Sequence, residues 1–119
     1  MESEQARPSA GHGTAADEPV IYEAIRAWDG SGAVIRGAEL DLATAVQRRR
    51  NSEDVVVCGP NKAKNYKVAT TIETPVGRWV RHLKHTLSAG VNALPHLQQL
   101  APPPGGHTFY ETENAKARS

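Results

Sequence analysis

The segment ALPHLQQLAPPPGGHTFYET, residues 93–112, carries the most information about the fold. Two runs of mixed apolar and polar residues, 93–100 and 107–112, flank a loop at 101–106 that contains three prolines and two glycines. Short runs of this kind around a Pro/Gly-rich loop predict strand, loop and strand. We therefore expect an antiparallel β-hairpin at this end of the sequence.

Alternation along the two predicted strands sorts their side chains by face. His96 and Gln98 share one face of the first strand, and His107, Phe109 and Glu111 share one face of the second. If the pairing brings the two histidine faces together, two imidazoles lie side by side on one surface of the sheet.

Upstream of the hairpin, the sequence predicts a buried strand between two helices. The β-branched run DVVVC at residues 54–58 is typical of a buried strand. Residues 41–50, DLATAVQRRR, have helical spacing of apolar positions, and the final three arginines suit the negative end of a helix. Asn61 is a suitable cap for a second helix over residues 62–72.

Residues 20–28, VIYEAIRAW, are ambiguous between helix and strand. Apolar residues fall on one helical face, so we expect a helix, then a turn at 29–32 and a short strand at 33–36. The alternative is a β-hairpin over the same residues. Residues 78–83 alternate loosely and predict a further strand.

These elements predict an α+β domain, with two or three helices packed on a small mixed or antiparallel sheet that ends in a C-terminal β-hairpin. Aromatic residues are only 5% of the 119, so the core must rely on Val, Ile, Leu and Ala, with Trp28 and Trp79 among its few large members. We expect a disordered tail at residues 1–17, one domain at 18–112 and a polar tail at 113–119.

The net charge of +1 hides an asymmetry along the chain. Residues 1–57 hold six arginines against ten acidic residues, whereas residues 58–110 hold six Lys and Arg against one glutamate. A basic half suits an anionic partner such as RNA, although cations spread over a solvated surface give the same count. No apolar run approaches a membrane span, and the N-terminal residues lack a signal-peptide core, so a cytoplasmic protein, or one delivered into a target cell, is expected.

Two imidazoles on one face, His96 and His107, are sufficient for RNA cleavage without a metal or cofactor. One accepts the proton of the 2′-OH as it attacks phosphorus, and the other protonates the departing 5′-oxygen. Residues expected to bind the substrate beside this pair are the following: Arg78, Arg81, Lys84, Gln98 and Tyr110. The alternative is two surface histidines with no joint role.

The order DVVVCGP at 54–60, a helix, Pro95-His96 on a strand, a Gly-rich loop and GHTFY at 106–110 resembles the C-terminal toxin domains of bacterial polymorphic toxins. The resemblance spans residues 54–112 and implies the barnase/EndoU-like ribonuclease group, with RNA as substrate and an immunity protein as partner. Of the histidines expected in that family, His96 and His107 match, whereas Gln98 stands where a second strand histidine is expected.

Three other interpretations compete with a ribonuclease. His82, His85, His96 and His107 with Cys58 form a candidate zinc set, although the sequence has no paired cysteine motif. Cys58, at a strand end before a helix, has the location of a nucleophile, but it is more typical of a buried core residue. The third is a non-catalytic binding or accessory module whose basic half contacts nucleic acid or an acidic partner.

Overall fold

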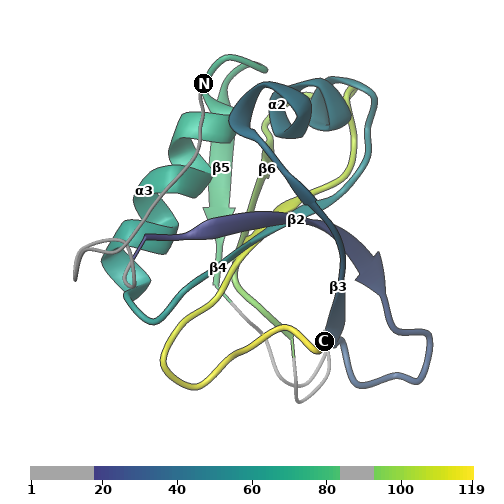
Figure 1. Cartoon of the computed structure of the whole chain (residues 1–119). Coiled ribbons are helices and arrows are strands. Elements are labelled where there is room, and N and C mark those ends of the chain that lie inside the picture. Colours follow the sequence, from purple (N-terminus) through teal and green to yellow (C-terminus); the bar gives the residue numbers. More distant parts are fainter. Residues whose placement is uncertain (1–17, 84–92) are drawn as a thin grey trace.

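The computed structural model describes residues 18–83 and 93–119, and in this part the chain forms two helices and a six-stranded mixed sheet (Figure 1). The elements are β2 (Val20–Arg26), β3 (Val34–Leu40), α2 (Leu42–Arg50), β4 (Val55–Cys58), α3 (Lys62–Glu73), β5 (Trp79–His82), β6 (His96–Gln99) and β7 (Thr108–Tyr110). The strand order is β3-β2-β4-β7-β6-β5. Only β4 and β7 pair in parallel; the other neighbours are antiparallel. The predicted α+β class is confirmed, as is the antiparallel pairing of β6 with β7.

The helix expected over residues 20–28 is wrong, and the alternative β-hairpin is correct. Val20–Arg26 is a strand that pairs with β3 on one side and with β4 on the other. Its apolar residues do fall at helical spacing, but pairing with two neighbouring strands satisfies its backbone along both edges and overrides that local pattern. Trp28, which follows the strand, was expected in the core. This expectation is wrong, because its side chain is 92% exposed.

The two predicted helices are confirmed, and each begins at the expected kind of residue. The carboxylate of Asp41 accepts a hydrogen bond from the Thr44 backbone N–H at 2.8 Å, and the Asn61 side chain accepts one from the Lys64 N–H at 3.0 Å. On α3 the apolar residues Ala69 and Ile72 are buried, whereas the buried face of α2 is not that of its apolar spacing. Ala45 and Arg49 are buried on α2, whereas Ala43 is exposed.

Each face of the sheet carries its own apolar cluster. On the face that α2 and α3 cover, Val55 and Val57 of β4 pack with Ile72 of α3. On the opposite face, Val56 and Phe109 pack with Leu94, which lies just before β6. All three valines of β4 have no exposed surface, so the prediction of a buried strand there is confirmed.

A fully buried ion pair joins the two helices to the sheet. Arg49 of α2 and Glu73 of α3 both have zero exposure, and the guanidinium donates two 2.9 Å hydrogen bonds to the carboxylate. The carboxylate also accepts from Thr108 of β7 at 2.7 Å and from Gln99 of β6 at 2.8 Å. The arginine run at the end of α2 therefore includes a residue of the core.

The C-terminal residues return to the outer strand of the sheet, β3, where Arg118 forms a parallel bridge with Ile35. The Arg118 N–H donates to the Val34 carbonyl at 2.7 Å, and the Arg118 carbonyl accepts from the Arg36 N–H at 2.8 Å. Ala115 is buried in the cluster on the face without helices. Neither α2 nor α3, the helices of the described residues, is long and apolar enough to cross a membrane. The tail predicted at 1–17 lies outside the described residues.

Candidate active site

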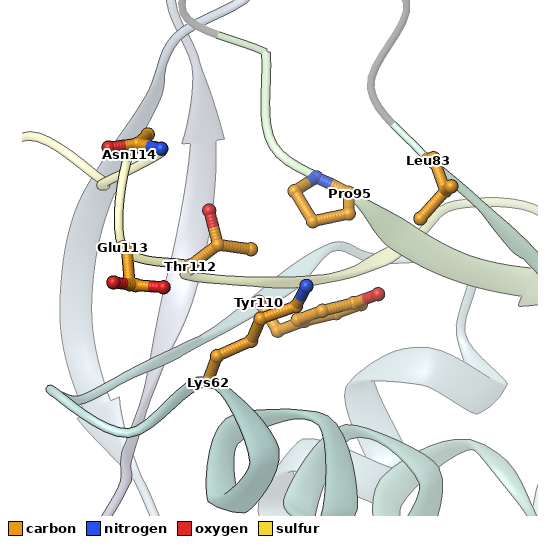
Figure 2. Close-up of a pocket in the computed structure, with 7 residues that line it drawn as sticks. All are labelled: Lys62, Leu83, Pro95, Tyr110, Thr112, Glu113 and Asn114. Carbon is orange, nitrogen blue, oxygen red and sulfur yellow. The ribbon is translucent and has the colours of Figure 1, made fainter.

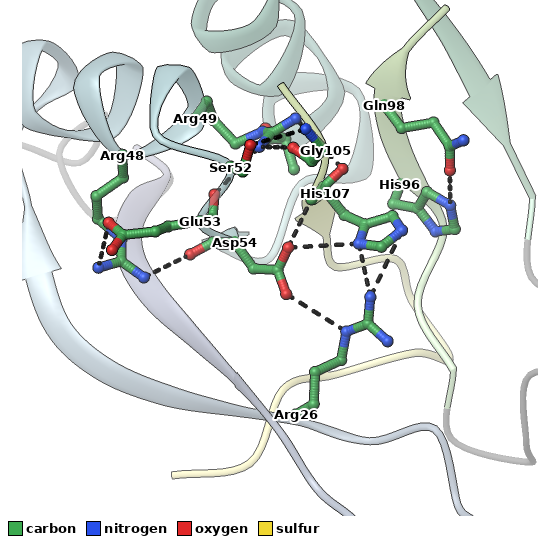
Figure 3. Close-up of polar contacts among 12 residues, drawn as sticks. Arg26, Arg48, Arg49, Ser52, Glu53, Asp54, His96, Gln98, Gly105 and His107 are labelled. Atoms are coloured by element: carbon green, nitrogen blue, oxygen red, sulfur yellow. Dashed lines mark hydrogen bonds and ion pairs between the residues drawn. The ribbon is translucent and has the colours of Figure 1, made fainter. Parts of the chain in front are cut away.

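The antiparallel pairing of β6 with β7 brings His96 and His107 together on the face without helices (Figure 3). His96 lies opposite Phe109, and His107 is two residues before Phe109, so all three side chains are on one face. The centroids of the two imidazole rings are 4.6 Å apart, and both rings contact the ring of Phe109 with centroids 5.3 to 5.5 Å away.

Two charged residues from neighbouring strands surround His107. The carboxylate of Asp54, just before β4, accepts the backbone N–H of His107 at 2.7 Å and lies 3.3 Å from the ring Nδ1. The guanidinium of Arg26, at the end of β2, lies 2.6 Å from the same Nδ1. Arg26 also forms an ion pair with Asp54 at 3.4 Å, and its guanidinium carbon is 5.4 Å from the centre of the Phe109 ring.

The two contacts to Nδ1 of His107 require different protonation states. A guanidinium only donates hydrogen bonds, so the 2.6 Å contact needs Nδ1 without a proton. A carboxylate only accepts, so the contact to Asp54 needs Nδ1 with a proton. Arg26 and Asp54 therefore compete for one ring nitrogen, and the partner that prevails decides whether Nδ1 carries a proton.

His96 is held in its neutral form. Burial lowers its pKa to about 4, and the neighbouring His107 and His82 add to this effect, against a hydrogen bond with Gln98 that opposes it. Its Nε2 lies 3.1 Å from the Gln98 side-chain oxygen. The ring of His82 on the adjacent strand β5 is 5.3 Å away, centroid to centroid. The pKa of His96 is therefore well below the ordinary imidazole value of 6.5.

Asp54 is an anion in this environment. Burial raises the pKa of its carboxyl, but two hydrogen bonds from His107 and the charges of His107 and Arg26 outweigh that effect and lower it below the ordinary value. A carboxylate, a guanidinium and two imidazoles thus meet on one face of the sheet. Together they offer a proton acceptor, a proton donor and a cation for an anionic substrate.

Of the predicted substrate-binding residues, Gln98 joins the histidine pair and two others lie on the opposite face of the sheet. Arg81 stacks over the ring of Tyr66 of α3, with its guanidinium carbon 5.3 Å from the ring centre. Tyr110 is buried against the same helix, with its ring 5.4 Å from that of Tyr66. We expected Arg81 beside the histidines, and this placement corrects it: strand alternation turns residue 81 away from His82 and His96.

Of the remaining two predicted cations, only Arg78 lies in the described residues, and it is away from the histidines. Arg78 precedes β5 and lines a hollow of about 340 Å³ with Gly77 and Gln99, at the other end of that strand from His82. Lys84 lies outside the described residues.

A pocket of about 220 Å³ lies at the start of α3 (Figure 2). Lys62 and Tyr110 line it together with Pro95 and Glu113. Because Tyr110 points away from the face of His96, this pocket is separate from the histidine pair. Tyr110, which we expected to bind the substrate beside the histidines, instead lines this pocket.

The described structure gives little support to the zinc and nucleophile hypotheses. Within residues 18–83 and 93–119, no three His, Cys, Asp or Glu side chains are arranged to hold a metal ion. His85, one of the candidate ligands, lies outside these ranges. Cys58 is buried, and burial together with the nearby Glu111 raises the pKa of its thiol to about 12, so it is a core residue with little thiolate.

Arg26 and Asp54 are the site residues that the sequence analysis missed. Arg26 was placed on a helix, so its position at the end of a central strand was not anticipated. Asp54 was seen as the beginning of a strand, and the parallel pairing of β4 with β7 that brings it to His107 is a long-range feature. Comparison with known proteins finds no family model, no curated protein and no solved structure that matches this chain. The site is therefore interpreted from its own geometry.

Proposed function

We propose that the chain is a ribonuclease that cleaves RNA by attack of a 2′-OH on the adjacent phosphorus, with His96 and His107 as its acid–base pair. The observation that carries the proposal is the pair of imidazoles 4.6 Å apart, one of which is contacted by both Arg26 and Asp54. RNA is the substrate class because the pair supplies the two proton transfers that transesterification needs, beside a cation for the phosphate.

His96 is assigned as the base. With a pKa of about 4, its ring is neutral at neutral pH and can accept the proton of the 2′-OH. The amide of Gln98 fixes the ring at Nε2 and can present either its oxygen or its nitrogen there, so the contact is compatible with an unprotonated Nε2. The substrate hydroxyl would take the place of Gln98 at this atom.

His107 is assigned as the acid, and Arg26 controls it. In the structure Nδ1 lies near both the Arg26 guanidinium, at 2.6 Å, and the Asp54 carboxylate, at 3.3 Å. When a phosphate binds, it attracts Arg26 away from the ring, and a neutral His107 with its proton on Nε2 can then take a second proton from the solvent on Nδ1 and donate it to Asp54 as a hydrogen bond. The protonated ring then has a second N–H, on Nε2, to transfer to the leaving oxygen. In this proposal, binding of the substrate thus brings His107 into the protonated form that acts as the acid.

The proposed reaction balances without a further reactant. The 2′-oxygen loses its proton to His96 and forms a bond to phosphorus, the bond from phosphorus to the 5′-oxygen breaks, and the 5′-oxygen takes a proton from His107. The products are a 2′,3′-cyclic phosphate and a 5′-hydroxyl. Arg26 stabilises the negative charge on the phosphorane oxygens.

The test is cleavage of a single-stranded oligoribonucleotide by the purified chain in the presence of a chelator. We expect products with 2′,3′-cyclic phosphate ends, and no cleavage of the same sequence as DNA, which lacks the nucleophile. A double variant, His96→Ala with His107→Ala, is the control for contaminating nuclease. Cleavage that disappears with the chelator, or that the double variant retains, would reject the mechanism.

The resemblance to toxin domains extends this proposal to the biological role. Such a domain would act on RNA inside a target cell and would be blocked by an immunity protein. Expression of the wild-type chain in bacteria should arrest growth and degrade RNA, whereas the double variant should do neither. Binding of RNA without any cleavage would instead support the alternative of a non-catalytic nucleic-acid-binding module.

A further inference from the structure

Trp28 is the most exposed large apolar side chain in the described structure, at 92% of its full accessibility. Tryptophan is rarely left in water to this degree, because its large ring is normally buried for most of its area. The histidine mechanism does not use it, and it is absent from both apolar clusters. Neither the core nor the proposed mechanism therefore explains this side chain, and its exposure is typical of a residue that contacts a binding partner.

Trp28 lies close to the proposed active site along the β2–β3 hairpin. The Ala27 N–H donates to the Ala33 carbonyl at 3.0 Å, so the strand pairing continues beyond Arg26. Trp28 itself lies at the bend that begins the turn, two residues after the last residue of β2, Arg26. Two residues of even an extended chain span only about 7 Å, so Trp28 begins within about the length of one nucleotide of Arg26.

The turn that follows Trp28 is held in place by polar contacts. The Asp29 carboxylate accepts the Ser31 backbone N–H at 3.0 Å and forms an ion pair with Arg118 at 3.3 Å. Arg118 is itself paired with Val34 and Arg36 through its backbone. The ring is thus presented on a fixed turn, and the acidic residue next to it is neutralised by a partner.

We propose that Trp28 is a stacking platform for the nucleobase that neighbours the scissile phosphate of a single-stranded RNA. This rests on the proposed function for the location of the phosphate, with Arg26 and His107. An exposed indole beside a guanidinium that faces a phosphate is the combination that binds single-stranded nucleic acid without reading its sequence. The subsite therefore takes any base, with a preference for those that stack best.

The test uses a 2′-O-methyl oligoribonucleotide, which cannot be cleaved because it lacks the attacking hydroxyl. Its affinity for the full chain is measured by titration, together with quenching of tryptophan fluorescence. The chain has two tryptophans, and Trp79 is partly buried and donates its ring N–H to Thr74 at 3.1 Å. The matched variants are therefore Trp28→Phe and Trp79→Phe, which remove one indole each.

We expect quenching in the wild type and in Trp79→Phe, and none in Trp28→Phe. Trp28→Ala should weaken binding by about 5- to 100-fold, and Trp28→Phe by only a few-fold, because a phenyl ring still stacks. Unchanged affinity in Trp28→Ala, or quenching that persists in Trp28→Phe, would overturn the subsite, including the case in which Trp28 serves a protein partner instead.

The measurements distinguish a failure of the proposed cleavage from a failure of the proposed stacking. If the wild type binds the methylated RNA through Trp28 but cleaves no RNA, the subsite stands and the proposed ribonuclease activity falls. If the chain cleaves RNA and Trp28→Ala leaves KM unchanged, the ribonuclease stands and the subsite falls. For a stacking residue one nucleotide from the reaction, KM should rise while kcat changes much less.

Discussion

The two faces of the sheet carry two polar clusters of opposite character. On the helix-covered face, Arg49 and Glu73 have no exposed surface, and no nitrogen or oxygen of their side chains is left buried without a partner. On the other face, the cluster around His107 is partly exposed. It contains Nδ1 of His96 and Nε of Arg26, two of the four buried side-chain atoms in the described residues that lack a hydrogen bond.

We assign different roles to the two clusters: the helix-covered cluster stabilises the fold, and the cluster around His107 carries the proposed reaction. A buried polar network that is fully satisfied fixes a unique arrangement of the elements around it, and Arg49 also donates to the carbonyls of Gly105 and Gly106 just before His107. The histidine cluster is less completely hydrogen-bonded, and under the proposed function a substrate adds contacts to it. The helix-covered cluster fixes the positions of the strands. Those positions bring together the side chains of the histidine cluster, which lie at the strand ends.

Breaking the helix-covered cluster should give the largest effect on stability. Glu73→Ala leaves the Arg49 guanidinium buried without its carboxylate, and we expect the free energy of unfolding to fall by about 3–5 kcal/mol. Urea denaturation followed by circular dichroism measures it. The double variant Arg49→Met with Glu73→Met should recover much of the loss, because no unpaired charge remains. A loss below 1 kcal/mol in Glu73→Ala would show that the pair is not a structural core.

Breaking the other cluster should abolish activity and leave the fold intact. His107→Ala should reduce kcat/KM for RNA by at least about 100-fold, the usual contribution of a general acid. Its free energy of unfolding should change by much less than that of Glu73→Ala, because His107 is partly exposed. A matched Asp54→Asn variant removes the carboxylate that pairs with the protonated ring and should also slow cleavage. Full activity in His107→Ala would contradict the assignment.

Acidification should weaken the fold through His96. Its pKa is about 4 in the folded chain and about 6.5 when unfolded, so the unfolded state binds more protons between these values. The contribution of His96 should therefore be lost as the pH drops from about 6.5 to 4, with a total loss of about 1–2 kcal/mol after allowance for partial solvent exposure. Below pH 4 any further loss comes from carboxylates such as Asp54, whose pKa is lowered in the folded chain. His96→Gln should lack this loss. A wild type whose stability is flat over that range would argue against a buried neutral imidazole.

Replacement of the exposed indole should have the smallest effect on the fold. Trp28→Ala removes a side chain that is 92% exposed, so the free energy of unfolding should change by no more than about 0.5 kcal/mol. The same urea titration measures it. A loss of 2 kcal/mol or more would mean that Trp28 packs against the protein, and the stacking subsite would lose its basis.

The sequence was most informative where local pattern and burial agree. The valine run of β4, the capped helices and the alternation of side chains within β6 and β7 all follow from short-range patterns. That His96 and His107 share a face depended on the pairing of the two strands, which the structure supplies. The pattern at Val20–Arg26 was misleading, since pairing with two strands decides its conformation and the sequence of the segment does not record that pairing. Arg26 was lost from the site for this reason.

Long-range contacts account for the rest. Arg49 was interpreted as part of a dipole-stabilising run because its partner Glu73 is 24 residues away on another helix. Asp54 reaches His107 across 53 residues, through a parallel pair that joins distant strands. Arg81 was expected at the histidines on the basis of charge alone, and strand alternation placed it on the other face.

The pH dependence of kcat/KM for an oligoribonucleotide, measured in chelator from pH 3 to 9, tests the acid–base assignment most directly. If His96 is the base, the activity should rise along an acid limb near pH 4, well below the 6.5 of a free imidazole, because protonation of His96 removes its lone pair. His96→Ala should lose both the activity and this limb. An acid limb at pH 6.5, or a limb near pH 4 that persists in His96→Ala, would contradict the account.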